Sequence, residues 1–214
     1  MEGKSWDDDP KQYGVMWASN LTQAIPAMSD AQLEKLLRQG AHPSRDELWV
    51  MPSQMFQHLS VPDMAALIAH LRSLPATGVK SPPPVPGPRA LAEIANGTYK
   101  PASTLVAENR DVLPADAGQQ FAQGRYITSQ TCAECHGMQL EGSKGEEGSI
   151  PDLIVASAYS PAEFDRFITT GETPGKREIH KLMVSVARSR FSHLTPHERQ
   201  ALYGYLRARA ELPQ

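Results

Sequence analysis

Hydrophobic and polar positions follow helical spacing at several places along the chain, and signals for helix starts and stops accompany them. A capping-box pattern begins at Ser29, and Gly40 supplies a stop, which predicts a helix between them. Ser160 and Gly171 frame a second helix in the same way, with proline at its first position. No segment shows the alternation typical of a strand. The pattern therefore predicts an all-α fold.

A second pair of predicted helices follows, one in each half of the chain. One lies in VPDMAALIAHLRSL (61–74) and the other in PHERQALYGYLRAR (196–209), with Leu67 matching Leu202. The first pair of helices is offset by 131 positions and the second pair by 135. Two matches in the same order, at nearly the same offset, indicate two copies of one unit.

This repeat predicts the domain organisation. We expect a first copy at 1–76, a connection at 77–114 and a second copy at 115–214. The connection is rich in proline (SPPPVPGPR) and should run as an extended, semi-rigid spacer, followed by a short helix in RALAEIAN.

Composition and charge narrow the functional classes. The chain is 40% hydrophobic and 21% charged, values ordinary for soluble globular proteins. Its net charge of -3 gives no indication of a nucleic-acid partner. No apolar run reaches the roughly 18 residues of a transmembrane helix, and the polar start does not resemble a secretory signal. The only two cysteines lie three positions apart, which excludes a disulfide framework.

Those two cysteines belong to a motif that can bind a cofactor. Cys132, Cys135 and His136 form C-x-x-C-H, the signature of c-type haem attachment. Thiols at this spacing can each add to a vinyl group of one porphyrin, and the next imidazole then ligates the iron. The motif predicts one covalently attached haem c, with His136 as an axial ligand.

Other interpretations of the cysteines remain open from the residues alone. A thioredoxin-like C-x-x-C would need a βαβ context, whereas the segment upstream is predicted to be helical. A zinc site could combine Cys132 and Cys135 with His193 and His197, but the gap between them fits no compact finger. The two cysteines could also be ordinary buried residues.

The second axial ligand has few candidates. Downstream of His136 the only methionines are Met138 and Met183, and Met138 is too close in sequence to reach the opposite face. Met183 is therefore the predicted distal ligand, on a loop before the last helix, with His180 and His193 as competitors. Met/His ligation would raise the reduction potential relative to bis-His ligation and close the iron to other ligands.

With these residues identified, the second copy resembles a class I cytochrome c domain along its whole length. Gly124 resembles the small residue of the first helix that touches the last helix, where Leu202 and Tyr205 resemble its partners. The resemblance implies that the carbonyl of Pro151 accepts the proximal imidazole's Nδ1 proton and that Leu153 packs on the haem. Ordinary loop packing is the alternative for both.

The first copy resembles the closing segment of bacterial two-domain, dihaem cytochromes c, which include cytochrome subunits of membrane-bound alcohol and sugar dehydrogenases. Met51 takes the place of that family's distal ligand, and Met55 is the less favoured candidate. No cysteine precedes Cys132, so no haem c can be attached there. A truncated start explains this better than a degenerate docking domain. We expect this partial copy to be less ordered, with Met51, Trp49 and Trp17 on an exposed face.

The functional prediction is an electron carrier and not an enzyme. The resemblance implies a periplasmic location and redox partner proteins, with electrons passing from a dehydrogenase to the respiratory chain. Two alternatives are a haem peroxidase-like enzyme with an open distal site and a non-catalytic docking module formed by the first copy.

Overall fold

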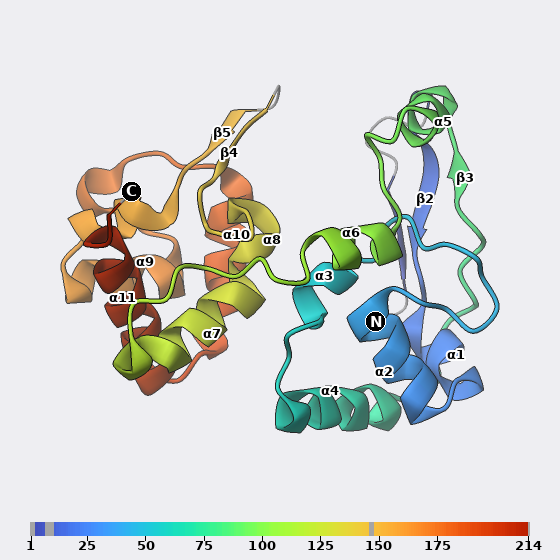
Figure 1. Ribbon diagram of the computed structural model, residues 1–214, viewed down its shortest axis with the longest axis horizontal. Coiled ribbons are helices and arrows are strands. Elements are labelled where there is room, and N and C mark those ends of the chain that lie inside the picture. The colour runs from blue at the N-terminus through green and yellow to red at the C-terminus, as the bar shows by residue number, and fades with distance from the viewer. Residues whose placement is uncertain (1–2, 7–10, 146–147, 214) are drawn as a thin grey trace. The chain divides into compact units, whose positions relative to one another are not determined.

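The structure is a computed structural model that describes residues 3–6, 11–145 and 148–213 (Figure 1). It divides into unit 1, Met1–Asp111, and unit 2, Val112–Gln214. Among the described helices, none is long and apolar enough to cross a membrane. Each unit has its own helices and its own short strands, so each is described separately.

Two helices of unit 1 begin at the caps that the sequence predicts. Ser29 accepts a hydrogen bond from the Gln32 backbone N–H, and Gly40 ends the helix with a φ of 64°. Ser60 is an N-cap in the same way, because its side chain accepts a hydrogen bond from the Asp63 backbone N–H. The helical elements are α1 Leu21–Ala24, η1 Ile25–Ala27, α2 Asp30–Gln39, α3 Ser53–Phe56, α4 Val61–Ser73, α5 Pro88–Ala95 and α6 Ala102–Glu108.

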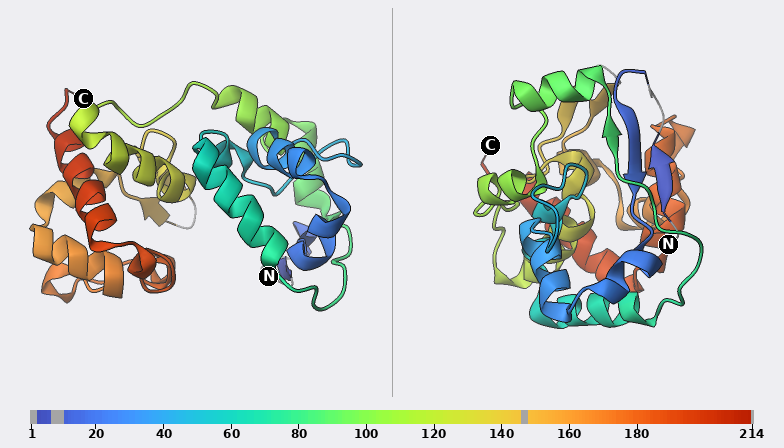
Figure 2. Two further views of the ribbon diagram at one scale, coloured as in Figure 1. Left: turned by 90° about the horizontal axis from the view of Figure 1, so that it is seen from below. Right: turned by 90° about the vertical axis from the view of Figure 1, so that its right-hand side faces the viewer.

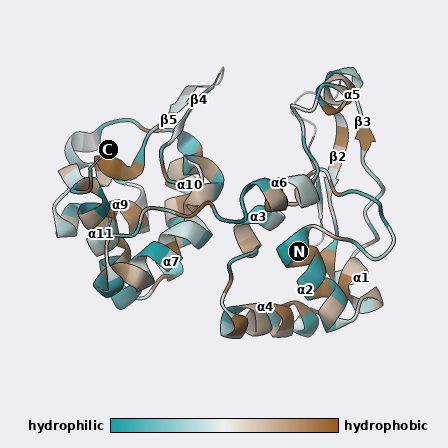
Figure 3. Ribbon diagram, viewed as in Figure 1, coloured by the Kyte–Doolittle hydropathy of each residue, from teal (hydrophilic) through white to brown (hydrophobic). Residues whose placement is uncertain are grey.

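Unit 1 has a hydrophobic core between its helices. Leu33 and Leu37 of α2 pack with Met64 and Ile68 of α4, and all four side chains are buried. Figure 3 shows both hydrophobic and hydrophilic residues along α2 and α4, as expected for helices with one buried face. Met51 is half-buried against this core, contrary to the expectation that it lies on an exposed face.

The two tryptophans expected on the same exposed face are also half-buried. Trp49 stacks on Tyr99 with ring centroids 5.8 Å apart. Trp17 lies in a strand, β2, and is half-buried there.

Unit 1 also contains a three-stranded antiparallel sheet, which corrects the all-α prediction. The strands are β1 Lys4–Trp6, β2 Gly14–Ala18 and β3 Val85–Pro86, in the order β1-β2-β3. β3 comes from the proline-rich segment that is predicted to be an extended, semi-rigid spacer. Asn20 holds the same segment, because its Nδ2 donates to the carbonyls of Thr77 and Val79 at 2.9 and 3.0 Å. The segment is thus a part of unit 1.

In the residues that the structure describes, unit 2 is helical apart from one pair of short antiparallel strands. Its predicted helices form with their caps: Ser160 and Glu163 make a capping box, and so do Thr195 and Glu198. The strand pair joins Ser143 to Ile150 and is the second departure from an all-α fold. The elements are η2 Gln119–Phe121, α7 Ala122–Thr131, α8 Ala133–His136, β4 Ser143–Gly145, β5 Gly148–Ile150, η3 Leu153–Ala158, α9 Pro161–Thr170, η4 Pro174–Lys176, α10 Lys181–Ser189, η5 Phe191–His193 and α11 Pro196–Ala210.

The first and last helices of unit 2 cross in close contact. Figures 1 and 2 show α7 and α11 side by side, and Gly124 lies at the crossing. A Cβ at Gly124 would lie 2.0 Å from the carbonyl oxygen of Ala201 and 2.6 Å from Cβ of Tyr205. Leu202 and Tyr205 are almost completely buried there, and the Tyr205 hydroxyl donates to Ala115 O at 2.7 Å. At its C-terminal end, α7 leads into α8 after one residue, Cys132.

Candidate functional site

The cysteines and the histidine lie at and after the end of α7: Cys132 links α7 to α8, and Cys135 and His136 lie in α8. The backbone N–H groups of Cys135 and His136 both donate to the carbonyl of Cys132, so one helical turn sets the three side chains. Cys132 and His136 are each 9% exposed, whereas Cys135 is exposed. Both thiols are free. The structure therefore brings two thiols and one imidazole together, as the motif predicts.

The ring of His136 has a defined partner. Its Nδ1 lies 2.8 Å from the carbonyl oxygen of Pro151. A carbonyl can only accept a hydrogen bond, so Nδ1 carries the proton and donates. The lone pair is then on Nε2, the nitrogen that remains for a metal.

The backbone around His136 is fixed by further hydrogen bonds. Gly142 N donates to His136 O at 2.7 Å, and Leu153 N donates to Leu140 O at 3.0 Å. Leu140 is fully buried and has a φ of 67°, a left-handed conformation that costs free energy for a residue with a branched side chain. Leu153 itself is half-buried at the start of η3. The loop after the histidine and the segment around Pro151 thus form one hydrogen-bonded unit.

The two thiols have raised pKa values. Burial raises the pKa of Cys132 to about 11, although a hydrogen bond with Thr131 opposes the shift. Burial also raises the pKa of Cys135, helped by the charge of Glu134 and opposed by that of Arg190. Reactive cysteines of the thioredoxin type have lowered pKa values. This environment therefore argues against a redox-active dithiol.

The zinc interpretation also lacks support. Within the described part of the chain, no three His, Cys, Asp or Glu side chains are close enough together to hold a metal ion. His193 and His197 are both exposed and lie at or near the start of α11. A four-ligand site with Cys132 and Cys135 is therefore not formed.

Met183 lies on a helix and not on a loop. It occupies the first turn of α10, where its N–H donates to His180 O at 3.0 Å, and its side chain is half-buried. His180 caps this helix, because its Nδ1 accepts from Leu182 N at 3.3 Å. His193, the other competitor, is exposed in η5. The choice of distal ligand stays a prediction.

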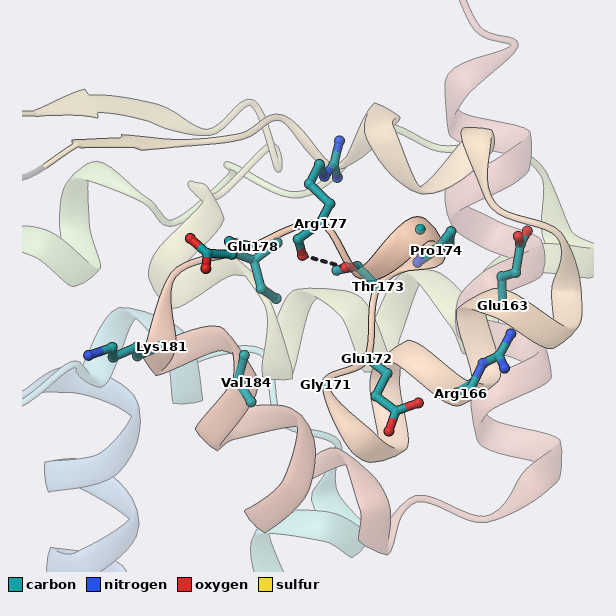
Figure 4. Close-up of a pocket in the computed structure, with 12 residues that line it drawn as sticks. Glu163, Arg166, Gly171, Glu172, Thr173, Pro174, Arg177, Glu178, Lys181 and Val184 are labelled. Carbon is teal, nitrogen blue, oxygen red and sulfur yellow. Dashed lines mark hydrogen bonds between the residues drawn. The ribbon is translucent and has the colours of Figure 1, made fainter.

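A cavity of about 810 Å³ lies beside α10 (Figure 4). Charged side chains, among them Arg166 and Lys181, line it together with Val184. At one side of the cavity, the Thr173 hydroxyl donates a hydrogen bond to the carbonyl of Arg177 and so joins the two ends of the segment 173–177. Neither the cysteines nor His136 line this cavity, so it is distinct from the immediate surroundings of the C-x-x-C-H motif.

Two residues near His136 were not singled out from the sequence. Asp152 accepts a hydrogen bond from Ile154 N at 2.8 Å, and Arg209 of α11 donates to the Asp152 carboxylate at 2.7 Å. Basic residues are common in the last turn of any helix, where they face the helix dipole. Arg209 therefore has no local sequence signal that separates it from its neighbours.

Part of the chain matches the model of a known protein family. Residues 119–206, most of unit 2, match the family described as "Cytochrome C oxidase, cbb3-type, subunit III". The match supports a class I c-type cytochrome domain. No curated protein is similar enough to the chain to count as a match. The cytochrome c match supports an electron-transfer haem protein with covalently bound haem c, and it covers the C-x-x-C-H motif but no part of unit 1.

The residues present in unit 2 fit haem c. Cys132 and Cys135 are two free thiols at the spacing that two vinyl groups require. His136 has its Nδ1 proton committed to Pro151 O, which leaves Nε2 for the iron. Neither thiol is engaged in a disulfide, so both are available to form thioether bonds.

Proposed function

We propose that this chain is an electron carrier with one haem c in unit 2, bonded to Cys132 and Cys135 and ligated by His136 and Met183. The observation that carries the proposal is the 2.8 Å contact between His136 Nδ1 and Pro151 O beside two free thiols. This contact is the arrangement that the cytochrome c resemblance implies. Unit 1, with no cysteine, would carry no haem c.

Each residue of the site has a separate role in this proposal. Haem c, when bound, supplies an iron that cycles between the ferrous and ferric states. Cys132 and Cys135 fix the position of the porphyrin through covalent bonds, so that a domain of this size needs no deep pocket. His136 keeps one tautomer because Pro151 holds its Nδ1 proton, and this hydrogen bond raises the basicity of the ligand. Leu153, half-buried and two residues on, is proposed to pack against the haem.

Met183 is the proposed distal ligand. It is the only methionine after His136 whose position in the sequence allows it to reach the opposite face, and α10 gives it a fixed place in unit 2. Met/His ligation closes the iron to small molecules and raises the reduction potential relative to bis-His ligation. A closed iron favours electron transfer over peroxidase chemistry.

The proposed setting is the periplasm, between a dehydrogenase and the respiratory chain. Haem c is attached outside the bacterial cytoplasm, and the family resemblance supports redox proteins as partners. The encounter with such partners is expected to be small and transient. Unit 1, which includes the partial cytochrome c-like copy, is proposed to contribute to docking.

Carbon monoxide tests the closed iron. The full chain, exported with the haem c maturation machinery present, should resist carbon monoxide when reduced and show the far-red absorption of a Met-ligated ferric haem. Met183→Ala should bind carbon monoxide and lose this absorption, whereas the matched control Met138→Ala should behave as the parent chain. A parent chain that binds carbon monoxide readily would contradict Met183 ligation and favour the peroxidase-like alternative.

A further inference from the structure

Arg209 is a buried cation that connects two loops. Only 7% of the residue is exposed, and it lies in the last turn of α11. Its Nη1 donates to Asp152 Oδ1 at 2.7 Å, and its Nη2 donates to the carbonyl of Gln139 at 2.9 Å. A buried guanidinium stays charged, so its partners must offset the lost hydration. These two bonds therefore constrain both loops at once.

Both loops belong to the immediate surroundings of His136. Gln139 lies in the turn that follows the histidine, and Asp152 directly follows Pro151, whose carbonyl accepts the Nδ1 proton. Asp152 also accepts from Ile154 N at 2.8 Å, which fixes the start of η3. Arg209 thus joins the segment that follows the histidine to the segment that holds its ring.

We propose that Arg209 and Asp152 are a positioning pair that keeps the Pro151 carbonyl at hydrogen-bond distance from His136 Nδ1. This inference rests on the proposed function, because its consequence is felt at the iron. A ring that donates its Nδ1 proton is a stronger base and a stronger ligand. A stronger ligand favours ferric iron, so the pair lowers the reduction potential of the haem.

The test must separate positioning from charge. Removal of Arg209 alone would leave Asp152 unpaired, and its charge would itself change the potential. The double variant Arg209→Gln with Asp152→Asn removes one positive and one negative charge and so keeps the net charge. It removes both ends of the ion pair while leaving the Pro151 carbonyl in the chain.

The same helix offers a matched control pair. Arg199 of α11 binds Asp165 of α9, with Nε and Oδ1 2.7 Å apart. Among the described residues, neither of the two is hydrogen-bonded to the loops around His136. The double variant Arg199→Gln with Asp165→Asn removes an ion pair of the same kind from the same helix. It reports the purely structural effect of losing such a pair.

Two measurements on the full haem-loaded chain decide the proposal. In the Arg209/Asp152 double variant, the reduction potential should rise, and solvent exchange of the His136 Nδ1 proton in the ferrous protein should be faster by about tenfold, as for the loss of one ordinary hydrogen bond. The Arg199/Asp165 variant should leave both values at those of the parent chain. The exchange rate of the Nδ1 proton reports on the His136 ring itself. A general loss of stability would change this rate in the control variant as well, so a change in the Arg209/Asp152 variant alone indicates positioning.

The outcomes that overturn the proposal are distinct from those that overturn the function. A haem-loaded Arg209/Asp152 variant with the potential and exchange rate of the parent would overturn the positioning role alone. If that variant fails to mature, Arg209→Lys decides, because an ammonium can keep one of the two bonds: intermediate values support the proposal, and parental values overturn it. A parent chain without haem c would overturn the proposed function, and the inference with it.

Discussion

His136 and Pro151 are fifteen positions apart in the sequence, yet one hydrogen bond of 2.8 Å joins them. The surrounding backbone makes this contact possible at a cost in free energy, since Leu140 adopts a left-handed conformation. Spacing alone identified the three residues of the C-x-x-C-H motif, because their geometry is local. The family resemblance, and not the spacing, indicated Pro151 as the partner of the imidazole. Neither spacing nor resemblance indicated Arg209, because its contact with Asp152 spans 57 residues and leaves no local sequence pattern.

At this scale the structure predicts a pH dependence. Partial burial by itself would raise the pKa of Asp152, but hydrogen bonds from Arg209 and Ile154 N, and nearby positive charge, lower it below 3.8. The folded state therefore gains stability from the ionised carboxylate above pH 3.8, and this gain is lost as the pH falls through the lowered pKa. The melting temperature of Asp152→Asn should be below that of the parent at pH 6, and the difference should shrink below about pH 4. A difference that stays constant down to pH 3 would contradict the assignment.

At the scale of elements, helix caps were the most informative sequence signal for where helices begin. Ser29, Ser160 and Thr195 each begin a helix as predicted, because a cap acts through its own backbone neighbours. The strands were missed for two reasons. β3 pairs with β2 from a distant part of the sequence, and β4 and β5 are built largely of glycine and small polar residues without alternation. The helix α10 was missed because it carries two valines and begins at a histidine cap.

The helix crossing gives a prediction with a control in the same pair of helices. Gly124→Ala should destabilise unit 2 by about 1–3 kcal/mol, since the new Cβ would meet the α11 backbone at 2.0 Å. Gly204→Ala on α11 has only the Phe121 ring near it, at 3.9 Å, and should stabilise by about 0.5–1 kcal/mol through helix propensity. Denaturant unfolding of the two variants measures both effects. Equal stabilities would show that α7 and α11 do not cross at Gly124.

At the scale of the whole molecule, the chain divides into two units between Asp111 and Val112. Only unit 2 contains cysteines. Unit 1 has a hydrophobic core and a sheet, and the proline-rich segment belongs to it. Unit 2 holds the complete C-x-x-C-H site. The repeat between the units stays a prediction from the sequence, as does the lower order expected for unit 1. The copy boundaries expected at 76 and 114 also stay predictions. Proline content does not reveal that Asn20 binds the proline-rich segment through the carbonyls of Thr77 and Val79.

The division predicts a proteolytic product. Arg110 is exposed beside the boundary, and the residues from 112 to 118 have no regular secondary structure. Brief trypsin treatment should cut after Arg110 and leave a fragment that contains unit 2 and keeps the visible spectrum of the full chain. Loss of the spectrum on cleavage, or preferred cleavage inside α7 or α11, would contradict two separately folded units.

The covalent attachment of one haem through both cysteines is the central claim, and the mass of the denatured full chain, exported with the haem c maturation machinery present, tests it most directly. The account predicts a mass equal to the polypeptide plus one haem, with no thiol left to react with an alkylating reagent. A mass of the polypeptide alone, with Cys132 and Cys135 both alkylated, would contradict it.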